Sequence, residues 1–92
     1  MLFMVVERFE NKDMAPVYAR LRERGRQLPD GLDYVDSWVE SDFSRCFQLM
    51  RCDDVALIHE WTRAWEGTGI TFEEIVPVVT SAEARSRVEG RA

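Results

Sequence analysis

The chain has 92 residues, of which 46% are hydrophobic and 32% are charged, with a formal net charge of −5 and a pI near 4.8. This acidic balance argues against a nucleic-acid partner, because affinity for phosphates comes from clustered Lys and Arg. No apolar stretch approaches the roughly 20 residues of a membrane helix, and the apolar run over residues 1–6 is too short for a signal-peptide core. We therefore expect a single cytoplasmic domain over residues 1–92, with no membrane partner.

The first predicted elements are a strand and a helix. Leu2–Phe9 begins with a continuous apolar run, which is typical of a central strand covered on both faces. A helix is predicted to start at Asp13, a favourable N-cap residue, with Pro16 in its first turn. Its apolar positions follow helical spacing: Met14, Val17, Leu21 and Leu28.

A hairpin is predicted next. The segment 28–32 indicates a turn, because Pro29 presets its own φ and Gly31 tolerates a positive φ. Two strands follow, over residues 32–40 and 45–52, joined by a loop over residues 41–44. With a loop of two or four residues, the pairs would be Trp38 with Phe47, Asp36 with Leu49, Ser37 with Gln48, and Val35 with Met50. A three-residue loop would shift every pair by one.

The last third of the chain predicts a second helix, a strand and a short C-terminal helix. Asp53 and Asp54 suit the positive N-terminal end of the second helix, which ends at the glycines 67–69. Its wide apolar face comprises Leu57, Ile58, Trp61, Ala64 and Trp65. The strand over residues 71–79 contains Pro77, which favours an edge position. Thr80 opens a capping box, and the helix after it is expected to fray near Gly90.

This order predicts an α+β fold of the ferredoxin-like βαββαβ type, an antiparallel sheet with two helices on one face plus the C-terminal helix. The other face would carry one of two apolar sets: Tyr34, Trp38, Phe47 and Leu49, or Val35, Val39, Cys46 and Met50. Either set is too apolar to be left in water. We therefore expect a homodimer that forms through this uncovered sheet face.

Several segments together carry a resemblance to a known family: residues 1–7, 24–29, 34–38 and 46–50, with Asp53-Asp54, Trp61, Trp65, Pro77-Val78 and residues 81–83. The chain resembles a small bacterial family of domains of unknown function within the dimeric alpha-beta barrel superfamily. The resemblance implies a dimeric α+β barrel and brings no established reaction. The superfamily includes cofactor-independent monooxygenases, haem-degrading monooxygenases, muconolactone isomerase-like enzymes and binding modules, and its enzymes hold a cavity between sheet and helices.

Six residues are candidates for binding a ligand in such a cavity: Arg24, Tyr34, Ser37, Trp38, Gln48 and Trp65. Arg24 interrupts the apolar stripe of the first helix, so its guanidinium either holds a carboxylate or phenolate or extends to water and pairs with an acid such as Asp36 or Glu7. Arg26, by contrast, is assigned to a solvated helix face.

Ser37 and Gln48 would lie opposite each other among apolar side chains, either as polar groups of a pocket or as partners of one another. Tyr34 and Trp38, with Asp36 between them, could hold a planar ligand or belong to the core or an interface. Trp65 could be a core residue or the edge of the cavity.

The sequence assigns no catalytic set, cofactor or metal. One histidine and two cysteines six positions apart do not make a zinc site, and the segment Gly67-Thr68-Gly69 lacks the lysine of a phosphate-binding loop.

We predict a small-molecule-binding protein whose ligand is aromatic or anionic. A cofactor-independent monooxygenase-like or isomerase-like enzyme, and a structural or interaction module with a filled core, are the alternatives. They differ in whether a cavity of several hundred Å³, with polar groups pointing inward, lies between sheet and helices.

Overall fold

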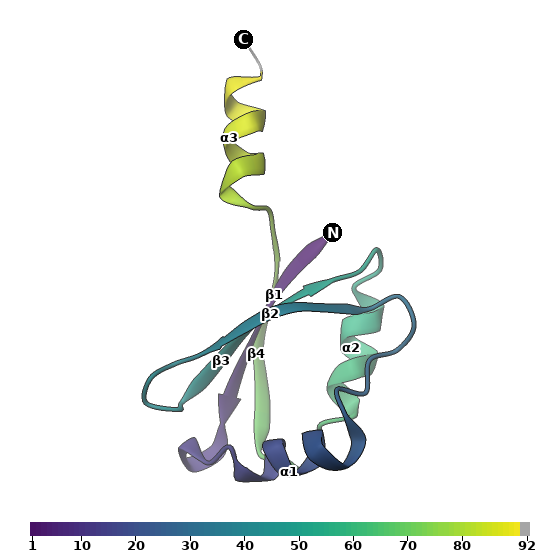
Figure 1. Ribbon diagram of the computed structural model, residues 1–92, viewed down its shortest axis with the longest axis vertical. Helices are drawn as coiled ribbons and strands as arrows, with labels where there is room; N and C mark the ends of the chain where they lie inside the picture. Colours follow the sequence, from purple (N-terminus) through teal and green to yellow (C-terminus); the bar gives the residue numbers. More distant parts are fainter. Residues whose placement is uncertain (91–92) are drawn as a thin grey trace.

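The structure, a computed structural model, describes residues 1–90. Its elements are β1 (Leu2–Phe9), the short 3-10 helix η1 (Glu10–Lys12), α1 (Ala15–Arg24), β2 (Asp33–Val39), β3 (Arg45–Arg51), α2 (Ala56–Arg63), β4 (Ile70–Val78) and α3 (Ser81–Glu89). The strands form one antiparallel sheet in the order β2-β3-β1-β4 (Figure 1). The predicted ferredoxin-like α+β fold is confirmed, with β1 and β3 central and β2 and β4 at the edges. The chain end beyond Gly90, where fraying is expected, lies outside the described residues.

The helices α1 and α2 begin slightly later than their predicted capping residues. Asp13 Oδ1 accepts a hydrogen bond from Ala15 N at 3.0 Å, and Asp54 Oδ1 accepts one from Ala56 N at 2.9 Å. Each aspartate therefore closes a short turn that leads into the helix, which has the same effect of satisfying a free backbone N–H. Helix α2 also ends at Arg63, earlier than the glycines that were expected to end it, and residues 64–69 form turns.

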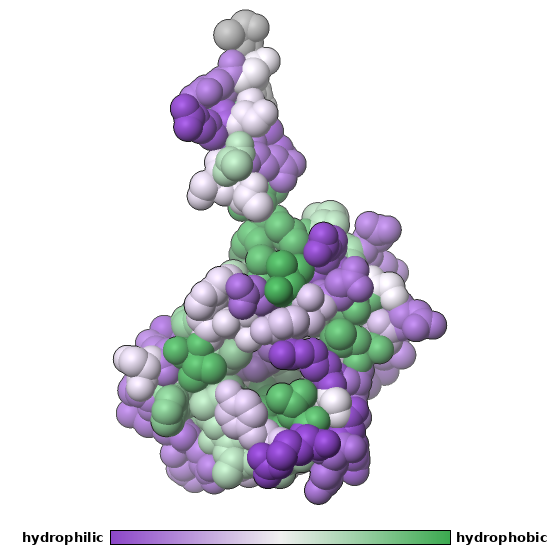
Figure 2. Space-filling model, in the orientation of Figure 1, coloured by the Kyte–Doolittle hydropathy of each residue, from purple (hydrophilic) through white to green (hydrophobic). Residues whose placement is uncertain are grey.

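Helix α3 projects away from the rest of the chain (Figure 1). The predicted capping residue is confirmed, because Thr80 Oγ1 accepts a hydrogen bond from Glu83 N at 3.0 Å. All of its residues are exposed, and its surface is largely hydrophilic (Figure 2). Two ion pairs between residues four apart, Arg85–Glu89 at 2.9 Å and Arg87–Glu83 at 2.8 Å, stabilise it modestly.

The β2–β3 hairpin has the predicted register over most of its length. Three predicted pairs are present: Ser37 with Gln48, Trp38 with Phe47, and Asp36 with Leu49. The fourth prediction is wrong, because Tyr34 and not Val35 lies opposite Met50. The register shifts between Tyr34 and Asp36, so Val35 is the extra residue of a β-bulge. The bulge returns Tyr34 to the same sheet face as Ser37, whereas strict alternation placed it with Trp38.

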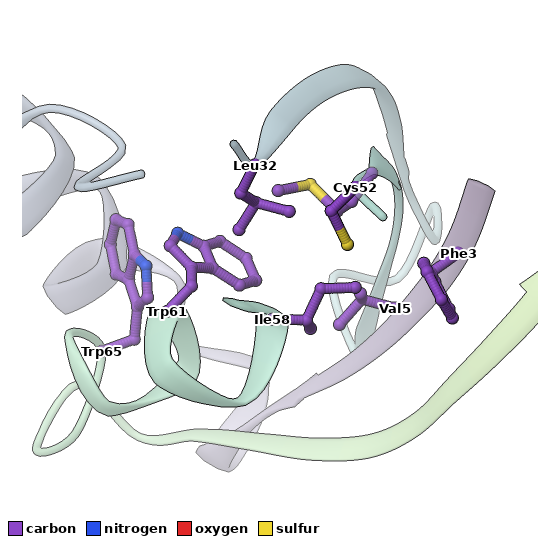
Figure 3. Packing of buried hydrophobic residues seen from close by; sticks show 8 residues of the cluster. Phe3, Val5, Leu32, Cys52, Ile58, Trp61 and Trp65 are labelled. Atoms are coloured by element: carbon purple, nitrogen blue, oxygen red, sulfur yellow. The ribbon is translucent and has the colours of Figure 1, made fainter. Parts of the chain in front are cut away.

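The core lies between the sheet and the two helices α1 and α2 (Figure 3). It consists of Phe3, Val5, Leu32, Met50, Cys52, Ile58, Trp61 and Trp65. Val17 and Leu21 of α1 pack against this cluster and are only partly buried. Cross-strand pairing of β1 with β3 and β4 places every second residue of β1 on this side, so the helix-covered face of β1 carries Phe3, Val5, Glu7 and Phe9.

The opposite face of the sheet is covered by no helix of residues 1–90 (Figure 1). Its apolar side chains include Met4, Val6, Trp38, Phe47, Leu49 and Val76. The indole of Trp38 is 50% exposed. Of the two apolar sets considered for this face, the one with Trp38 is present, but Tyr34 has left it because of the bulge.

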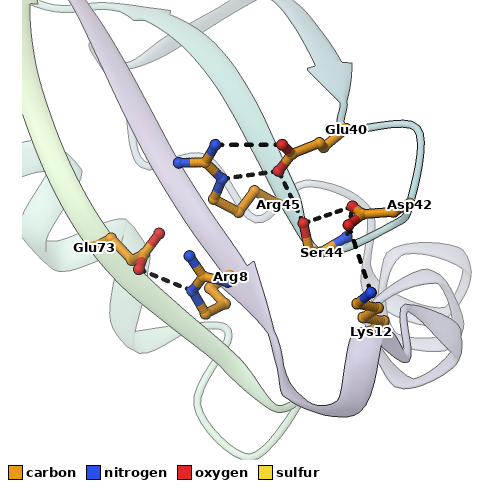
Figure 4. Close-up of polar contacts among 7 residues, drawn as sticks. All are labelled: Arg8, Lys12, Glu40, Asp42, Ser44, Arg45 and Glu73. Atoms are coloured by element: carbon orange, nitrogen blue, oxygen red, sulfur yellow. Dashed lines mark hydrogen bonds and ion pairs between the residues drawn. The ribbon is translucent and has the colours of Figure 1, made fainter.

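The loop between β2 and β3 is held by polar contacts (Figure 4). Arg45 Nε donates to Glu40 Oε1 at 2.8 Å, and the hydroxyl of Ser44 lies 2.8 Å from Glu40 Oε1 and 2.6 Å from Asp42 Oδ1. Lys12 pairs with Asp42 at 3.5 Å, which links the loop to η1. These groups are in contact with solvent, with the Arg45 and Glu40 side chains about one-third exposed, so each pair contributes little to the free energy of unfolding and mainly fixes the hairpin geometry.

Candidate functional site

A cavity of about 110 Å³ lies between the sheet and the helices, on the side of α1. Its lining is mostly apolar and includes Phe9, Val17, Leu21, Trp61, Trp65 and Ile70. The polar groups on its wall are Glu7, Arg26, Ser37 and Gln48, together with the thiol of Cys46. Tyr18 and Val39, which are 45% and 37% exposed, lie where the cavity meets solvent, and Figure 2 shows a recess on this face between β2 and α1.

Glu7 is the most unusual residue of the cavity. It lies on the central strand β1 between Val5 and Phe9, and it is only 5% exposed. Within residues 1–90, no group donates a hydrogen bond to its carboxyl. Burial raises the pKa of this carboxyl from its ordinary value of 4.5 to about 7, and the positive charge of Arg26 opposes the rise only in part. Near neutral pH, the protonated and ionised forms of Glu7 are therefore both populated.

Arg26 reaches the cavity from the loop after α1. The helix ends at Gly25, whose φ of +68° turns the chain and whose N–H donates to Leu21 O at 2.8 Å. Trp61 Nε1 donates to Arg26 O at 2.8 Å, which ties this loop to α2. The guanidinium carbon of Arg26 lies 3.5 Å from the ring centroid of Tyr34, a cation–π contact. Arg26 and Glu7 thus face the same cavity without forming a direct ion pair.

Ser37 and Gln48 lie opposite each other on β2 and β3, which confirms the predicted pairing, and both line the cavity. Each also has a partner within the protein. The Oγ of Ser37 lies 2.6 Å from the Oη of Tyr34, and Gln48 Nε2 donates to Met50 Sδ at 3.2 Å. These contacts fix the orientation of both side chains, so the polar part of the wall is preformed.

The six candidate residues do not all meet. Trp65 lines the cavity, and within the described residues its buried Nε1 has no hydrogen-bond partner. Arg24 is exposed at the end of α1 and is not part of the cavity wall, and Trp38 lies on the other face of the sheet. The position expected for Arg24 is occupied by Arg26, because Gly25 ends the helix between them.

Sequence reasoning missed Glu7 and Arg26 as site residues. Glu7 was considered only as an ion-pair partner, and Arg26 was assigned to a solvated face. A signal for Glu7 was present, because it lies two residues from Val5 and two from Phe9 and so shares their buried face. Arg26 had no such signal, since its direction depends on the positive φ of Gly25 and of Gln27.

The fold and the cavity together define a ferredoxin-like α+β protein with a partly polar internal pocket. The whole chain, residues 1–92, matches a family described as a domain of unknown function, DUF3303, and the chain belongs to this family. No curated protein and no solved structure shows significant similarity to it. Among residues 1–90, no helix has the length and apolar character needed to span a membrane, and no group of three His, Cys, Asp or Glu residues is placed to hold a metal ion.

Proposed function

We propose that the protein binds a small molecule in the cavity between the sheet and the helices. The observation that carries this proposal is the buried carboxyl of Glu7, which lines the cavity and has no hydrogen-bond partner in the described chain. The carboxyl oxygens keep some accessible surface, and the fully buried side-chain polar atom without a partner among residues 1–90 is Trp65 Nε1 on the same wall. Polar groups in such surroundings are nearly always hydrogen-bonded, because leaving one unsatisfied costs free energy. A ligand with a polar end directed at Glu7 would supply the missing partner.

The cavity volume limits the size of this ligand. At about 110 Å³ it is smaller than the several hundred Å³ expected for a ligand-binding protein of this fold, so the structure of residues 1–90 has a smaller cavity than predicted. An engineered apolar cavity of about 150 Å³ holds benzene, so a pocket of this size with one open side suits a single ring. The apolar side chains around it would contact the ring, and the polar wall would orient it.

Titration of the full chain with toluene and phenol, followed by amide and methyl NMR shifts, tests this proposal. We expect shifts at cavity residues such as Val17 and Ile70, with stabilisation by about 2.7 kcal/mol at a ligand concentration of roughly 100 times Kd. Leu21→Trp, which fills the cavity, should abolish binding, whereas Val55→Trp at an exposed site should not. If neither compound shifts the cavity residues, the proposal fails.

Catalysis by proton transfer is a second candidate function, of the isomerase-like kind. It is favoured by the pKa of Glu7, since a pKa of about 7 suits a general acid or base at neutral pH. Glu7 would remove a proton from a carbon next to a carbonyl group and return it, while Arg26 stabilises the enolate oxygen. The test is deuterium incorporation from D₂O into cyclopentanone, which Glu7→Gln should abolish. Equal exchange with and without the protein would exclude this activity for the probe and leave binding as the function.

The uncovered sheet face supports a homodimer, which we propose as the functional assembly. The face is apolar at its centre and carries both signs of charge, with Arg8 and Arg45 on the central strands and Asp36 and Glu74 on the edge strands. Two copies facing each other would bury the apolar side chains, with Arg8 and Arg45 already paired within each copy to Glu73 and Glu40. Sedimentation velocity should give twice the chain mass of 10.7 kDa, and Trp38→Lys should give the chain mass itself. A monomeric wild-type chain at high concentration would refute the dimer.

A further inference from the structure

We propose that the ligand is a planar anion, a ring bearing a carboxylate or a phenolate oxygen, which binds between Glu7 and Arg26 while Glu7 takes up one proton from solution. This inference rests on the proposed binding function and specifies the chemical class of the ligand. Three features of the cavity support it. Glu7 and Arg26 are its charged side chains, Glu7 can lose its charge by taking up a proton, and, within the described part of the chain, the N–H groups of Arg26 are free to donate hydrogen bonds.

The charges that face Glu7 are few. Arg26 faces it from the loop after α1, and Cys46 faces it from the neighbouring strand β3. Burial and the charge of Glu7 raise the pKa of the Cys46 thiol to about 12, so the thiol stays neutral. Tyr18 of α1 is the other titratable residue of the wall, at its solvent edge. The lining residues from α2, β2 and β4 are Trp61, Ser37, Val39 and Ile70, none of which carries a charge.

The two charged groups respond differently to a charged ligand. A guanidinium stays protonated at any pH at which the protein is folded, so Arg26 would always repel a cation in this small space. A carboxyl can lose its charge by taking up a proton, and the protonated form then donates a hydrogen bond where the ionised form would repel an anion. The cavity can therefore remove its negative charge when an anion binds, but it cannot remove its positive charge when a cation binds.

The geometry of Arg26 favours a flat ligand. One face of the guanidinium lies against the ring of Tyr34, and within residues 1–90 its N–H groups have no side-chain or backbone acceptor. The N–H groups of a guanidinium lie in its plane, so they remain free to bind two oxygens or one oxygen at the edge. The aromatic rings of Trp61 and Trp65 and the aliphatic side chains of α1 would contact the ring of the ligand.

Three probes of similar shape test which ligand charge the cavity prefers: benzoate is an anion, benzamide is neutral and benzamidine is a cation. We would titrate the full chain with each by calorimetry, at pH 6 and pH 8 and in two buffers with different ionisation enthalpies. Benzoate should bind most tightly, with uptake of up to one proton per molecule bound at pH 8. Its affinity should fall about tenfold for each pH unit above the pKa of Glu7, because binding then requires a proton from solution.

Variants assign this effect to the two residues. Glu7→Gln should bind benzoate with an affinity that does not change between pH 6 and pH 8. The control variant Glu60→Gln, at an exposed position of α2 outside the cavity wall, should keep the pH dependence. Arg26→Met should weaken benzoate at least tenfold, and Arg24→Met, outside the cavity, should leave it unchanged. The proton uptake is measured on the wild-type chain, so this part of the test does not depend on whether a variant folds.

The outcomes separate the inference from the binding function on which it rests. If benzamide or benzamidine binds as tightly as benzoate, or if benzoate binds without proton uptake at pH 8, the anion inference is wrong while small-molecule binding stands. If none of the three probes binds, and toluene and phenol also leave the cavity residues unshifted, the inference and the proposed function both fail.

Discussion

The buried carboxyl of Glu7 should make the protein less stable as pH rises through neutrality. In the unfolded chain the carboxyl ionises with its ordinary pKa of 4.5, and in the folded chain the pKa is about 7. Between these values the folded state holds a proton that the unfolded state has lost, so the free energy of unfolding falls with increasing pH. The contribution is complete below about pH 4.5 and is lost by about pH 8. The difference between the folded and unfolded pKa values of Glu7 corresponds to about 3 kcal/mol of unfolding free energy. This is a large part of the unfolding free energy of about 5 to 15 kcal/mol that is typical of a domain.

Urea denaturation of the wild type and of Glu7→Gln between pH 5 and pH 8 measures this effect. The wild type should lose about 2 to 3 kcal/mol more than Glu7→Gln over this interval, since Gln cannot ionise. Glu60→Gln serves as the control, because this carboxyl is exposed on α2, away from the cavity wall and the uncovered sheet face, and its removal should leave the pH profile of the wild type unchanged. Parallel profiles for the wild type and Glu7→Gln would show that Glu7 is ionised at its ordinary pKa in the folded state, and the physical basis for a proton-accepting cavity would be lost.

Three further predictions concern the core, α3 and a buried thiol. Met50→Ala should lower the free energy of unfolding by about 2 to 5 kcal/mol in urea, because the side chain is fully buried, and a loss below about 1 kcal/mol would mean that the core closes over the gap. Thr80→Ala should reduce the helical circular dichroism of α3 by removing a cap that contributes about 1 kcal/mol, with no change in the urea midpoint of the domain, and a shifted midpoint would contradict the independence of α3. Cys46 should react with iodoacetamide at pH 8 only after denaturation, because it is buried and its pKa is raised to about 12, and rapid labelling of the folded chain would disprove this.

The fold could be predicted from the sequence because its main signals are local. The continuous apolar run of β1 and the Pro77 of β4 indicated which strands are central and which lie at the edge, and the sheet order confirms both. The hairpin register also followed from the pattern down to Asp36. The predicted register was wrong at Val35, where the structure has a β-bulge. A bulge depends on how the strand fits its neighbour, and the alternation of residues in the sequence does not reveal it.

Only those residues of the candidate site that are positioned by strand pairing could be predicted from the sequence. Ser37 and Gln48 were placed opposite each other by register alone, and they do line the cavity. Arg24 was placed by continuing helical spacing through a glycine. The chain leaves the helix at Gly25, whose positive φ directs the next arginine, Arg26, toward Tyr34. Such a change of direction is set by backbone angles and loop contacts, which residue spacing does not encode.

The bulge at Val35 affects both faces of the sheet. By adding one residue to an edge strand, it removes an aromatic ring from the exposed face and places that ring beneath the guanidinium of Arg26. Deleting Val35 would make the pairing regular and leave Tyr34 opposite Met50, whereas regular pairing with Val35 retained would turn the ring to the exposed face and away from Arg26. The pairing irregularity of β2, and not the alternation of its residues, therefore decides which face of the sheet receives the Tyr34 ring.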